Sequence, residues 1–345
     1  MKKPIGVFFA DTHLSESTIE INKFIWKQAD ELAIKLGVPL FHGGDVFTAR
    51  KAQPLVVLTA FQKILDELKS KVNFIPGNHD KVDLNSRNSY LDQFCHHPKV
   101  QLYRYYGSIP LGNDIHLHML PYFKEDEKYS EYLKELLDDN VVIEKGKQNI
   151  LLTHIAIDGV PNNDSSVVLN NLNQDLFGFY DLVLIGHYHQ RKELGDNMLY
   201  IGSAYQNDFG EDYQKGFMIL YNDLSFEFVN SKFPQYVTIK IDLDTILEEE
   251  ITAFHKTYQN SSDFIRFVVT GKEEKRKAFD KTKYESVGIK VVFKDTSIET
   301  EIEKASKGKF VSFNKSNIGD QFKEFCIKEN LDYNHGIKYL KEQLQ

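Results

Sequence analysis

Cysteine is scarce in this sequence, and the scarcity limits the chemistry open to the protein. The 345 residues contain two cysteines, Cys95 and Cys326, and neither belongs to a C-x-x-C pair. We therefore expect neither a disulfide framework nor a thiolate zinc site. The two residues are interpreted as reduced thiols with no special role.

Long apolar runs are also missing. No stretch approaches the roughly 18 apolar residues of a membrane-spanning helix. The N-terminal run 5–10 follows two lysines, but Asp11 ends it well short of the about 7–15 residues of a secretory signal. These absences predict a cytoplasmic protein with no membrane contact, in the host cytoplasm if a phage encodes it.

Basic residues do not dominate the composition. The 42 Lys and Arg residues are outnumbered by 50 Asp and Glu residues, which gives a formal net charge of −8 at pH 7. A protein that coats nucleic acid non-specifically is usually basic, so this charge counts against such a role. It leaves open an enzyme that grips phosphates locally through metal ions.

In the first two-thirds of the chain, short apolar strands alternate with amphipathic helices. A capping box of Ser17 and Glu20 predicts a helix over 17–36, and Pro54 opens a second helix. The expected strands are 5–10, 38–41, 72–75, 150–153, 181–185, 198–201 and 217–221. Such alternation predicts an α/β fold, and the pattern alone favours a single parallel sheet.

The pattern changes near residue 232. Residues 237–293 alternate strand, helix, strand, helix and strand, which predicts a small α+β unit. From Asp320 onward, apolar residues recur at the spacing of amphipathic helices. We therefore expect three parts: a main domain at 1–232, an α+β domain at 233–298, and a linker with a helical tail at 299–345.

Five short motifs end apolar runs in the main domain. They are Asp11-Thr12-His13, Gly44-Asp45, Gly77-Asn78-His79-Asp80, Thr153-His154 and Gly186-His187-Tyr188-His189. Each follows an expected strand, and ligands of open α/β sheets collect outside the carboxyl ends of the strands. The motifs are therefore expected to meet at one rim, where they offer carboxylates, an amide and imidazoles but no thiolate.

This set of side chains is suited to holding metal ions. Seven of them are candidate ligands: Asp11, His13, Asp45, Asn78, His154, His187 and His189. Seven are too many for one ion and enough for two if one carboxylate bridges. Oxygen and nitrogen ligands suit manganese, iron or zinc without choosing among them. Two ions about 3.5–4 Å apart form a template for phosphoryl transfer, and His79 is the best candidate proton donor to the leaving alkoxide.

Taken singly, several of these residues have an ordinary structural explanation. Gly-Asp pairs are common in turns, and a Thr-His pair alone is more typical of a core histidine. Gly77-Asn78-His79-Asp80 after a strand is the most specific motif. His116 and His118 lack acidic neighbours in the sequence, so we interpret them as surface residues of a strand. His42 is expected to face away from the rim.

In this order, the motifs resemble those of the calcineurin-like metallophosphoesterase superfamily over roughly residues 5–205. The resemblance implies an α/β fold built on a β-sandwich flanked by helices. It implies two groups of metal ligands, bridged by Asp45: Asp11, His13 and His189 for one ion, and Asn78, His154 and His187 for the other. His79 would be the general acid or transition-state stabiliser, and Asp80 would orient it.

Within that superfamily, the sequence resembles the SbcD-type nuclease subunits of double-strand-break repair complexes, including phage recombination versions. Residues 44–47 match their Gly-Asp-aliphatic-Phe start, with Pro54 opening the next helix, and residues 201–217 resemble the region after their last motif. Protein phosphatases carry Arg-Gly after Gly-Asp, whereas Arg50 here precedes Lys51. Several cellular members carry a histidine where this chain has Thr48, which leaves the balance of exonuclease and endonuclease open.

This resemblance implies a DNA exonuclease or endonuclease with two divalent metal ions, Mn²⁺ by preference, acting in recombination, repair and replication. Residues 233–298 would cap DNA, and the tail would dock onto an SbcC-type coiled-coil ABC ATPase in a complex that contains a homodimer of this chain. Candidate contacts to DNA phosphates are Arg50, Lys51, Lys81, Arg87 and Arg191. A phosphatase or cyclic-nucleotide phosphodiesterase on the same scaffold is the alternative, and a scaffold subunit with an idle site is a third hypothesis.

Overall fold

The computed structural model describes most of the chain up to residue 294. The described residues are 2–50, 52–84, 87–123, 129–131, 133, 143, 146–160, 172–294 and 323. The chain divides into two compact units: one holds 1–239, 253–266 and 282–290, and the other holds 240–252, 267–281 and 291–345. Among the described residues, no helix combines the length and the apolar character needed to cross a membrane.

The first large sheet is mixed. Its strands, in spatial order, are β12 (Phe226–Asn230), β11 (Gly216–Tyr221), β1 (Pro4–Phe9), β2 (Leu40–His42), β3 (Val72–Phe74) and β4 (Val100–Leu102). Strands β1 to β4 are parallel, while β11 pairs antiparallel with both β1 and β12. Helix α1 (Ile19–Leu36) connects β1 to β2, and α2 (Leu55–Glu67) connects β2 to β3. These are the crossovers that parallel neighbours require.

The second large sheet contains the later strands of the same unit. In spatial order they are β5 (Gly107–Pro110), β6 (Ile115–Leu120), β7 (Gln148–His154), β8 (Leu182–Gly186), β10 (Met198–Tyr200) and β9 (Lys192–Glu193). The four inner strands are parallel, and the two edge strands pair antiparallel. Three short 3-10 helices lie at Glu16–Thr18, Tyr90–Phe94 and Gln174–Phe177.

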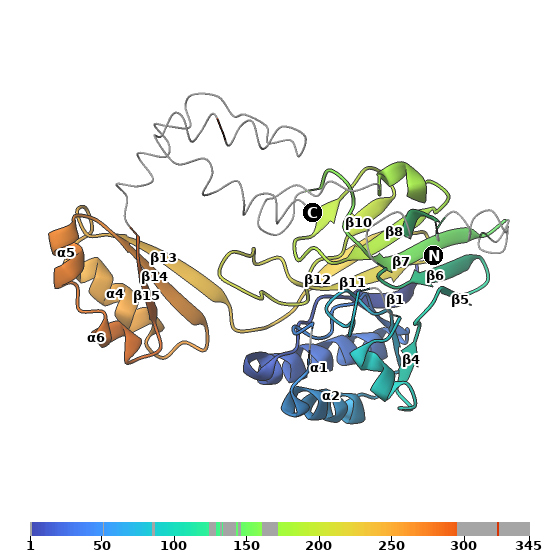
Figure 1. Ribbon diagram of the computed structural model, residues 1–345, viewed down its shortest axis with the longest axis horizontal. Coiled ribbons are helices and arrows are strands. Elements are labelled where there is room, and N and C mark those ends of the chain that lie inside the picture. The colour runs from blue at the N-terminus through green and yellow to red at the C-terminus, as the bar shows by residue number, and fades with distance from the viewer. Residues whose placement is uncertain are drawn as a thin grey trace. The chain divides into compact units, whose positions relative to one another are not determined.

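Strand β1 shows how the two sheets form a sandwich. Phe9 belongs to the apolar cluster shared with α1 and contacts Trp26, with ring centroids 4.8 Å apart. Its neighbours Phe8 and Ala10 belong to the other cluster, which contains Ile150 and Leu152 of the second sheet. Both faces of β1 are therefore buried, which explains its continuous apolar run. Helices α1 and α2 lie against the first sheet (Figure 1).

The mixed α/β architecture with a β-sandwich is therefore confirmed, and the single parallel sheet suggested by the pattern alone is wrong. A strand that is buried on both faces has the same continuous apolar sequence whichever of the two sheets it joins. Its sequence therefore does not show to which sheet it belongs. The interpretation of His116 and His118 as surface residues is also wrong, because both are buried. Strand β6 is internal and buried, and His118 lies 2.9 Å from Asn149 of β7.

The start of α1 differs from the expected capping box. The reciprocal contacts are made two residues earlier: the backbone N–H of Ser15 donates to the hydroxyl of Thr18, and the two hydroxyls lie 3.0 Å apart. Glu20 instead pairs with Lys23 at 2.7 Å. A 3-10 turn precedes the α-helix and shifts its first turn along the chain. The end of the helix is as expected, because Gly37 has the left-handed φ of 67°.

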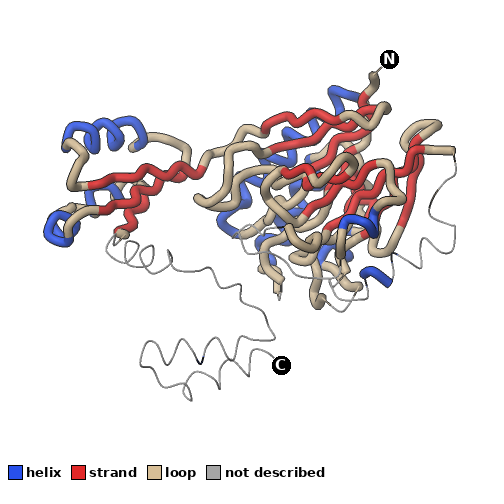
Figure 2. Tube along the Cα trace, turned by 90° about the horizontal axis from the view of Figure 1, so that it is seen from above, coloured by secondary structure: helices blue, strands red, loops and turns tan. Residues whose placement is uncertain are grey.

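A third, three-stranded sheet follows the sandwich in sequence (Figure 2). Its strands are β13 (Tyr236–Asp242), β14 (Phe264–Thr270) and β15 (Lys290–Phe293). Helix α4 (Glu248–Tyr258) connects the first two strands, and α5 (Glu273–Ala278) and α6 (Thr282–Glu285) lie between the last two in sequence. The predicted order of strands and helices is confirmed, except that two short helices, α5 and α6, lie between β14 and β15 where one was expected. The domain boundaries at 232 and 298 stay predictions, and the tail at 299–345 lies outside the described residues apart from Lys323.

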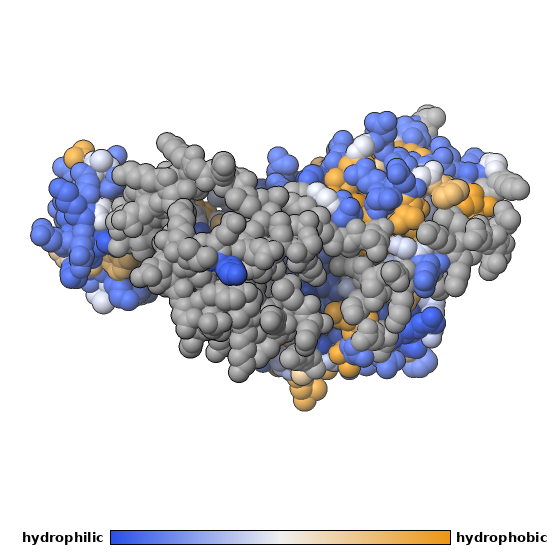
Figure 3. All heavy atoms as spheres, turned by 45° about the horizontal axis from the view of Figure 1, so that its top comes forward, coloured by the Kyte–Doolittle hydropathy of each residue, from blue (hydrophilic) through white to orange (hydrophobic). Residues whose placement is uncertain are grey.

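Hydrophilic side chains cover much of the described surface on the face drawn in Figure 3, with hydrophobic ones between them. Among the described residues, the most exposed large apolar side chain is Leu55 at the start of α2, which is 78% exposed. Scattered apolar residues are ordinary on a folded surface and need no separate explanation.

Candidate metal centre

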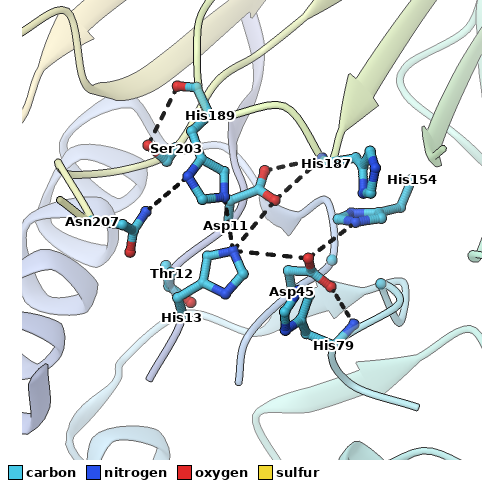
Figure 4. A network of polar contacts seen from close by, with 12 residues as sticks. Asp11, Thr12, His13, Asp45, His79, His154, His187, His189, Ser203 and Asn207 are labelled. Atoms are coloured by element: carbon cyan, nitrogen blue, oxygen red, sulfur yellow. Dashed lines mark hydrogen bonds and ion pairs between the residues drawn. The ribbon is translucent and has the colours of Figure 1, made fainter. Parts of the chain in front are cut away.

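The five motifs meet at one edge of the sandwich. They follow β1, β2 and β3 of the first sheet and β7 and β8 of the second. Backbone contacts join them: Asp11 N–H donates to the carbonyl of Gly44 at 3.0 Å, and Ala10 forms a parallel bridge with Ser203. Strand ends from both sheets therefore place their polar side chains around one point (Figure 4).

The backbone at this edge is strained. Among the described residues, only five other than glycine have a positive φ. Four of them are candidate ligands: Asp11 at 54°, His13 at 40°, Asp45 at 57° and His187 at 102°. L-residues seldom adopt this region, and such strain persists only where the surrounding structure enforces it. Here it turns side chains from successive loops toward a common centre.

Glycines allow the loops to approach one another. A Cβ on Gly77 would overlap both the side chain and the backbone nitrogen of Asp45. A Cβ on Gly44 would lie 2.9 Å from the Cα of Gly77 and would also overlap the ring of His154. Gly44 and Gly77 are therefore needed for close packing of the loops that carry Asp45 and Asn78.

One group of ligand-type side chains consists of Asp11, His13 and His189. Their nitrogen and oxygen atoms lie within 4.8 Å of one another. The Nε2 atoms of His13 and His189 are only 2.9 Å apart, and His13 Nε2 lies 3.9 Å from Asp11 Oδ1. Two imidazoles thus direct the same nitrogen to one point beside a buried carboxylate.

A second group consists of Asp45, His154 and His187, together with Asn78. His154 Nε2 lies 3.3 Å from Asp45 Oδ2, and the Asn78 amide lies 3.1 Å from both His154 and His187. Asp45 Oδ2 is also 3.8 Å from His13 Nε2. Asp45 therefore lies between the two groups, the place that a bridging carboxylate would occupy.

His154 is oriented and charged by its neighbours. Its Nδ1 donates to the carbonyl of Gly43 at 2.8 Å, so Nε2 faces the centre. Burial alone would lower the pKa of His154, but the carboxylates of Asp45 and Asp11 and the Gly43 carbonyl together outweigh it and raise the pKa to about 9. Burial likewise opposes ionisation of Asp45, yet the His154 imidazole holds the pKa of that carboxyl well below its usual range. The two side chains form a buried ion pair.

The donor set fits divalent metal ions. Asp11 and Asp45 are 0% and 1% exposed, and buried carboxylates require compensating positive charge. The converging atoms are oxygens and imidazole nitrogens, as manganese, iron and zinc accept. The structure brings together all seven residues expected as ligands, in the two groups that the resemblance implies.

His79 is held by the loop that follows the Gly-Asp motif. Its Nδ1 lies 2.5 Å from the carbonyl oxygen of Thr48, and its Nε2 lies 2.9 Å from Arg50 Nη2.

The expectation that Asp80 orients His79 is wrong. The Asp80 carboxylate instead accepts backbone N–H groups of Asp45, Gly77 and Phe47. A carboxylate can satisfy several amides at once, so it fixes the two loops against each other.

An open cavity of about 650 Å³ leads to both groups. His13, Asp45, His79, His187 and His189 contribute to its lining, together with Thr48, Arg50, Asn207 and Tyr236. The cavity therefore gives a substrate access to the converging ligand atoms and to His79.

The five candidate DNA contacts have different surroundings. Arg50 lines the cavity. Lys81 is 1% exposed, so its expected phosphate contact is not supported. Arg191 stacks on Phe228 and lines a different cavity. Arg87 is exposed over the ring of Tyr105, and Lys51 lies outside the described residues.

Two residues of the site were missed from the sequence. Glu211 lies 2.5 Å from Nδ1 of His189, and Lys215 lies 3.0 Å from Glu211. Burial alone would raise the pKa of Glu211, but its contacts with His189 and Lys215 lower it to about 2. The sequence shows a Glu and a Lys four residues apart within residues 201–217, the segment that resembles the SbcD-type region. That spacing alone does not indicate a contact with His189.

The comparisons with known proteins agree with this geometry. The sequence model of the family described as calcineurin-like phosphoesterase matches residues 7–191, which is more than half of the chain. That span contains every residue of both groups and His79. No curated protein matches the chain. The family hydrolyses phosphoesters with divalent metal ions, and the chain belongs to the calcineurin-like phosphoesterases.

Proposed function

We propose that this phosphoesterase is a DNA nuclease that cleaves phosphodiester bonds at a site holding two divalent metal ions, with Mn²⁺ as the preferred ion. The observation that carries the two-ion proposal is the position of Asp45. One of its oxygens lies 3.3 Å from His154 and 3.8 Å from His13, so it faces both ligand groups. A single carboxylate shared by two sets of ligands is the arrangement that a two-metal site requires.

The roles of the residues follow from their positions. Asp11, His13 and His189 would hold one ion, and Asn78, His154 and His187 would hold the other, with Asp45 shared by both groups. When bound, such ions polarise the phosphate and lower the pKa of a coordinated water. His79 lines the same cavity, and its Nδ1 donates to the carbonyl of Thr48. Its Nε2 accepts from the Arg50 guanidinium at 2.9 Å, so this nitrogen would protonate the leaving alkoxide only after it has taken up a proton and Arg50 has turned to the phosphate.

DNA as the substrate is supported by the sequence around this site. Residues 44–47 and Pro54 match the start of the SbcD-type nucleases, and residues 201–217 resemble their region after the last motif. A three-stranded α+β sheet follows, where those proteins carry a DNA-capping domain. Arg50 brings a guanidinium to the cavity, where a phosphate would bind.

The same resemblance supports a place in a larger complex. We propose that residues 299–345 dock onto a coiled-coil ABC ATPase of the SbcC type and that the complex contains a homodimer of this chain. Co-expression with such an ATPase, followed by size-exclusion chromatography of the full chain and of a chain ending at residue 298, tests the docking. Co-elution of both forms would reject it.

A nuclease assay with Mn²⁺ tests the substrate. The purified chain is expected to degrade linear duplex DNA, and Asp45→Ala is expected to lose bound metal and activity together. Asp196→Asn, which removes an exposed carboxylate, is the matched control and should retain both. Loss of cleavage when a chelator is added to the unaltered chain and to Asp196→Asn would show that cleavage depends on the metal.

A chromogenic phosphodiester separates the nuclease from its alternatives. Rapid cleavage of this small substrate or of a cyclic nucleotide, with no cleavage of DNA, would identify a phosphatase or phosphodiesterase on the same scaffold. Purified protein that binds no metal would identify a scaffold subunit.

A further inference from the structure

His189 is held from behind by a carboxylate. Its Nε2 points toward His13, and its Nδ1, on the opposite side of the ring, lies 2.5 Å from Oε1 of Glu211. A carboxylate accepts a hydrogen bond, so Nδ1 carries the proton and Nε2 presents its lone pair to the ligand group. The ring direction and the tautomer of His189 are therefore both set by Glu211.

Lys215 holds the same histidine through two routes. Its Nζ donates to the backbone carbonyl of His189 at 2.6 Å and to Oε2 of Glu211 at 3.0 Å. The lysine side chain is only 1% exposed. A lysine is rarely buried unless its charge is paired, and here the pairing directs Glu211 toward the His189 ring.

The loop carrying Glu211 is fixed by further contacts. Oε2 of Glu211 also accepts the backbone N–H of Asn207 at 3.1 Å, and the Glu211 carbonyl accepts the side chain of Gln206 at 2.9 Å. The backbone N–H of Ser203 donates to the His189 carbonyl at 3.0 Å. A connected support for His189 is thus formed by Ser203, Gln206, Asn207, Glu211 and Lys215.

We infer that Glu211 and Lys215 are positioning residues that fix the tautomer and direction of His189 and so set the metal affinity of the group it forms with Asp11 and His13. The inference rests on the metal centre of the proposed function. Carboxylates that orient a ligating histidine typically change metal affinity 10- to 100-fold when removed. Both residues lie beyond the segment 7–191 that matches the family.

A simple loop ion pair would not have the same consequence. If Glu211 only neutralised Lys215, removal of Glu211 would alter the loop and leave the imidazole of His189 unchanged. The contact between Oε1 and His189 Nδ1 instead couples the carboxylate to the ligand ring. Metal affinity and the histidine tautomer therefore distinguish the two explanations.

Mn²⁺ titration of the full chain by isothermal calorimetry tests the inference without DNA. Glu211→Ala is expected to weaken one of the two binding events by about 10- to 100-fold and to leave the other near its original affinity. Asp212→Asn is the matched control. It removes one negative charge from the same loop, and its Oδ1 lies 4.0 Å from Lys215. It should bind Mn²⁺ like the unaltered chain.

Glu211→Gln keeps the size of the side chain and guards against loss of folding. Its single amide oxygen cannot accept from both His189 and Lys215, so its Mn²⁺ affinity should lie between those of the unaltered chain and Glu211→Ala. Imidazole ¹⁵N NMR of the metal-free protein, at a pH high enough to keep the His189 ring neutral, should show the Nδ1-protonated tautomer of His189 and its partial loss in both variants.

Three results would overturn the inference: unchanged Mn²⁺ binding in both Glu211 variants, an equal loss in Asp212→Asn, or an unchanged His189 tautomer. The result is separable from the nuclease proposal. A chain that binds two Mn²⁺ ions but does not cleave DNA would reject the nuclease and leave the positioning role standing. Active protein with unaffected Glu211 variants would reject only the positioning role.

Discussion

The imidazole of His79 donates a hydrogen bond from Nδ1–H to the backbone carbonyl of Thr48, 2.5 Å away. The hydroxyl of Thr48 in turn donates to the carbonyl of His13 at 2.6 Å. Thr48 therefore connects the first and third motifs through its backbone and its side chain together. Thr48 thus contributes to the site by holding His79.

Replacement of His79 by alanine should separate catalysis from metal binding. The contact of this residue with Asp45 is made by the backbone N–H, at 2.8 Å from Oδ1, and alanine retains it. We expect kcat to fall by about 10²–10⁴-fold, as for loss of a general acid, with Mn²⁺ binding nearly unchanged. Single-turnover cleavage and calorimetry measure the two quantities. A near-normal rate would remove His79 from the chemistry.

Arg50→Ala should weaken substrate binding. The guanidinium lines the cavity beside His79, where it can contact a phosphate. Loss of one charged hydrogen bond costs about 1.5–3 kcal/mol, which corresponds to a rise in KM of roughly ten-fold or more. Arg50→Lys should recover part of the loss, since the charge remains without the planar fork. Lys63→Ala on the exposed surface of α2 is the control, and an equal effect there would point to general electrostatics.

Asp80→Asn should loosen both loops that carry metal ligands. The two carboxylate oxygens accept the amides of Asp45, Gly77 and Phe47 at 2.9, 2.9 and 3.1 Å. The asparagine amide turns one acceptor into a donor and leaves at least one buried N–H without a partner. The expected loss is about 1–3 kcal/mol of unfolding free energy, measured by urea denaturation. Asp196→Asn should change it by less than about 0.5 kcal/mol, and an equal value for both variants would contradict the role of Asp80.

The sequence predicts the parts of the site that are local. Asp11, Asp45 and Asn78 lie within four residues of the ends of β1, β2 and β3, so the short apolar segments before them predict their place at the carboxyl edge of the sheet. Which sheet a strand joins depends instead on contacts between distant segments, and β6 with its buried His118 could not be assigned from its own residues.

The supporting residues of the site are also non-local. Glu211 reaches His189 across 22 residues, and no spacing in the sequence marks that pair. Lys81 follows a metal-binding motif and was expected at the surface, yet the fold buries it. Motif chemistry identifies the atoms that converge on a metal, whereas the side chains that orient those atoms depend on the whole tertiary structure.

Metal binding should release a proton and strengthen as pH rises. In the metal-free protein burial lowers the pKa of His154, but the carboxylates of Asp45 and Asp11 and the Gly43 carbonyl together raise it to about 9. His154 is therefore protonated at pH 7, whereas an imidazole must be neutral to ligate a metal. Below pH 9 each unit of pH should change Mn²⁺ affinity by up to about ten-fold for this one proton, with weaker binding at lower pH.

Calorimetry in buffers of different ionisation enthalpy measures the number of protons released on binding. At pH 7 we expect at least one per chain, and His154→Ala should release fewer and bind Mn²⁺ more weakly. The ion pair of His154 and Asp45 is the reason: the imidazolium supplies the positive charge that the buried carboxylate needs, and the metal ion replaces it. Mn²⁺ binding without proton release, or affinity that falls as pH rises from 6 to 8, would show that His154 does not carry this charge in the metal-free protein.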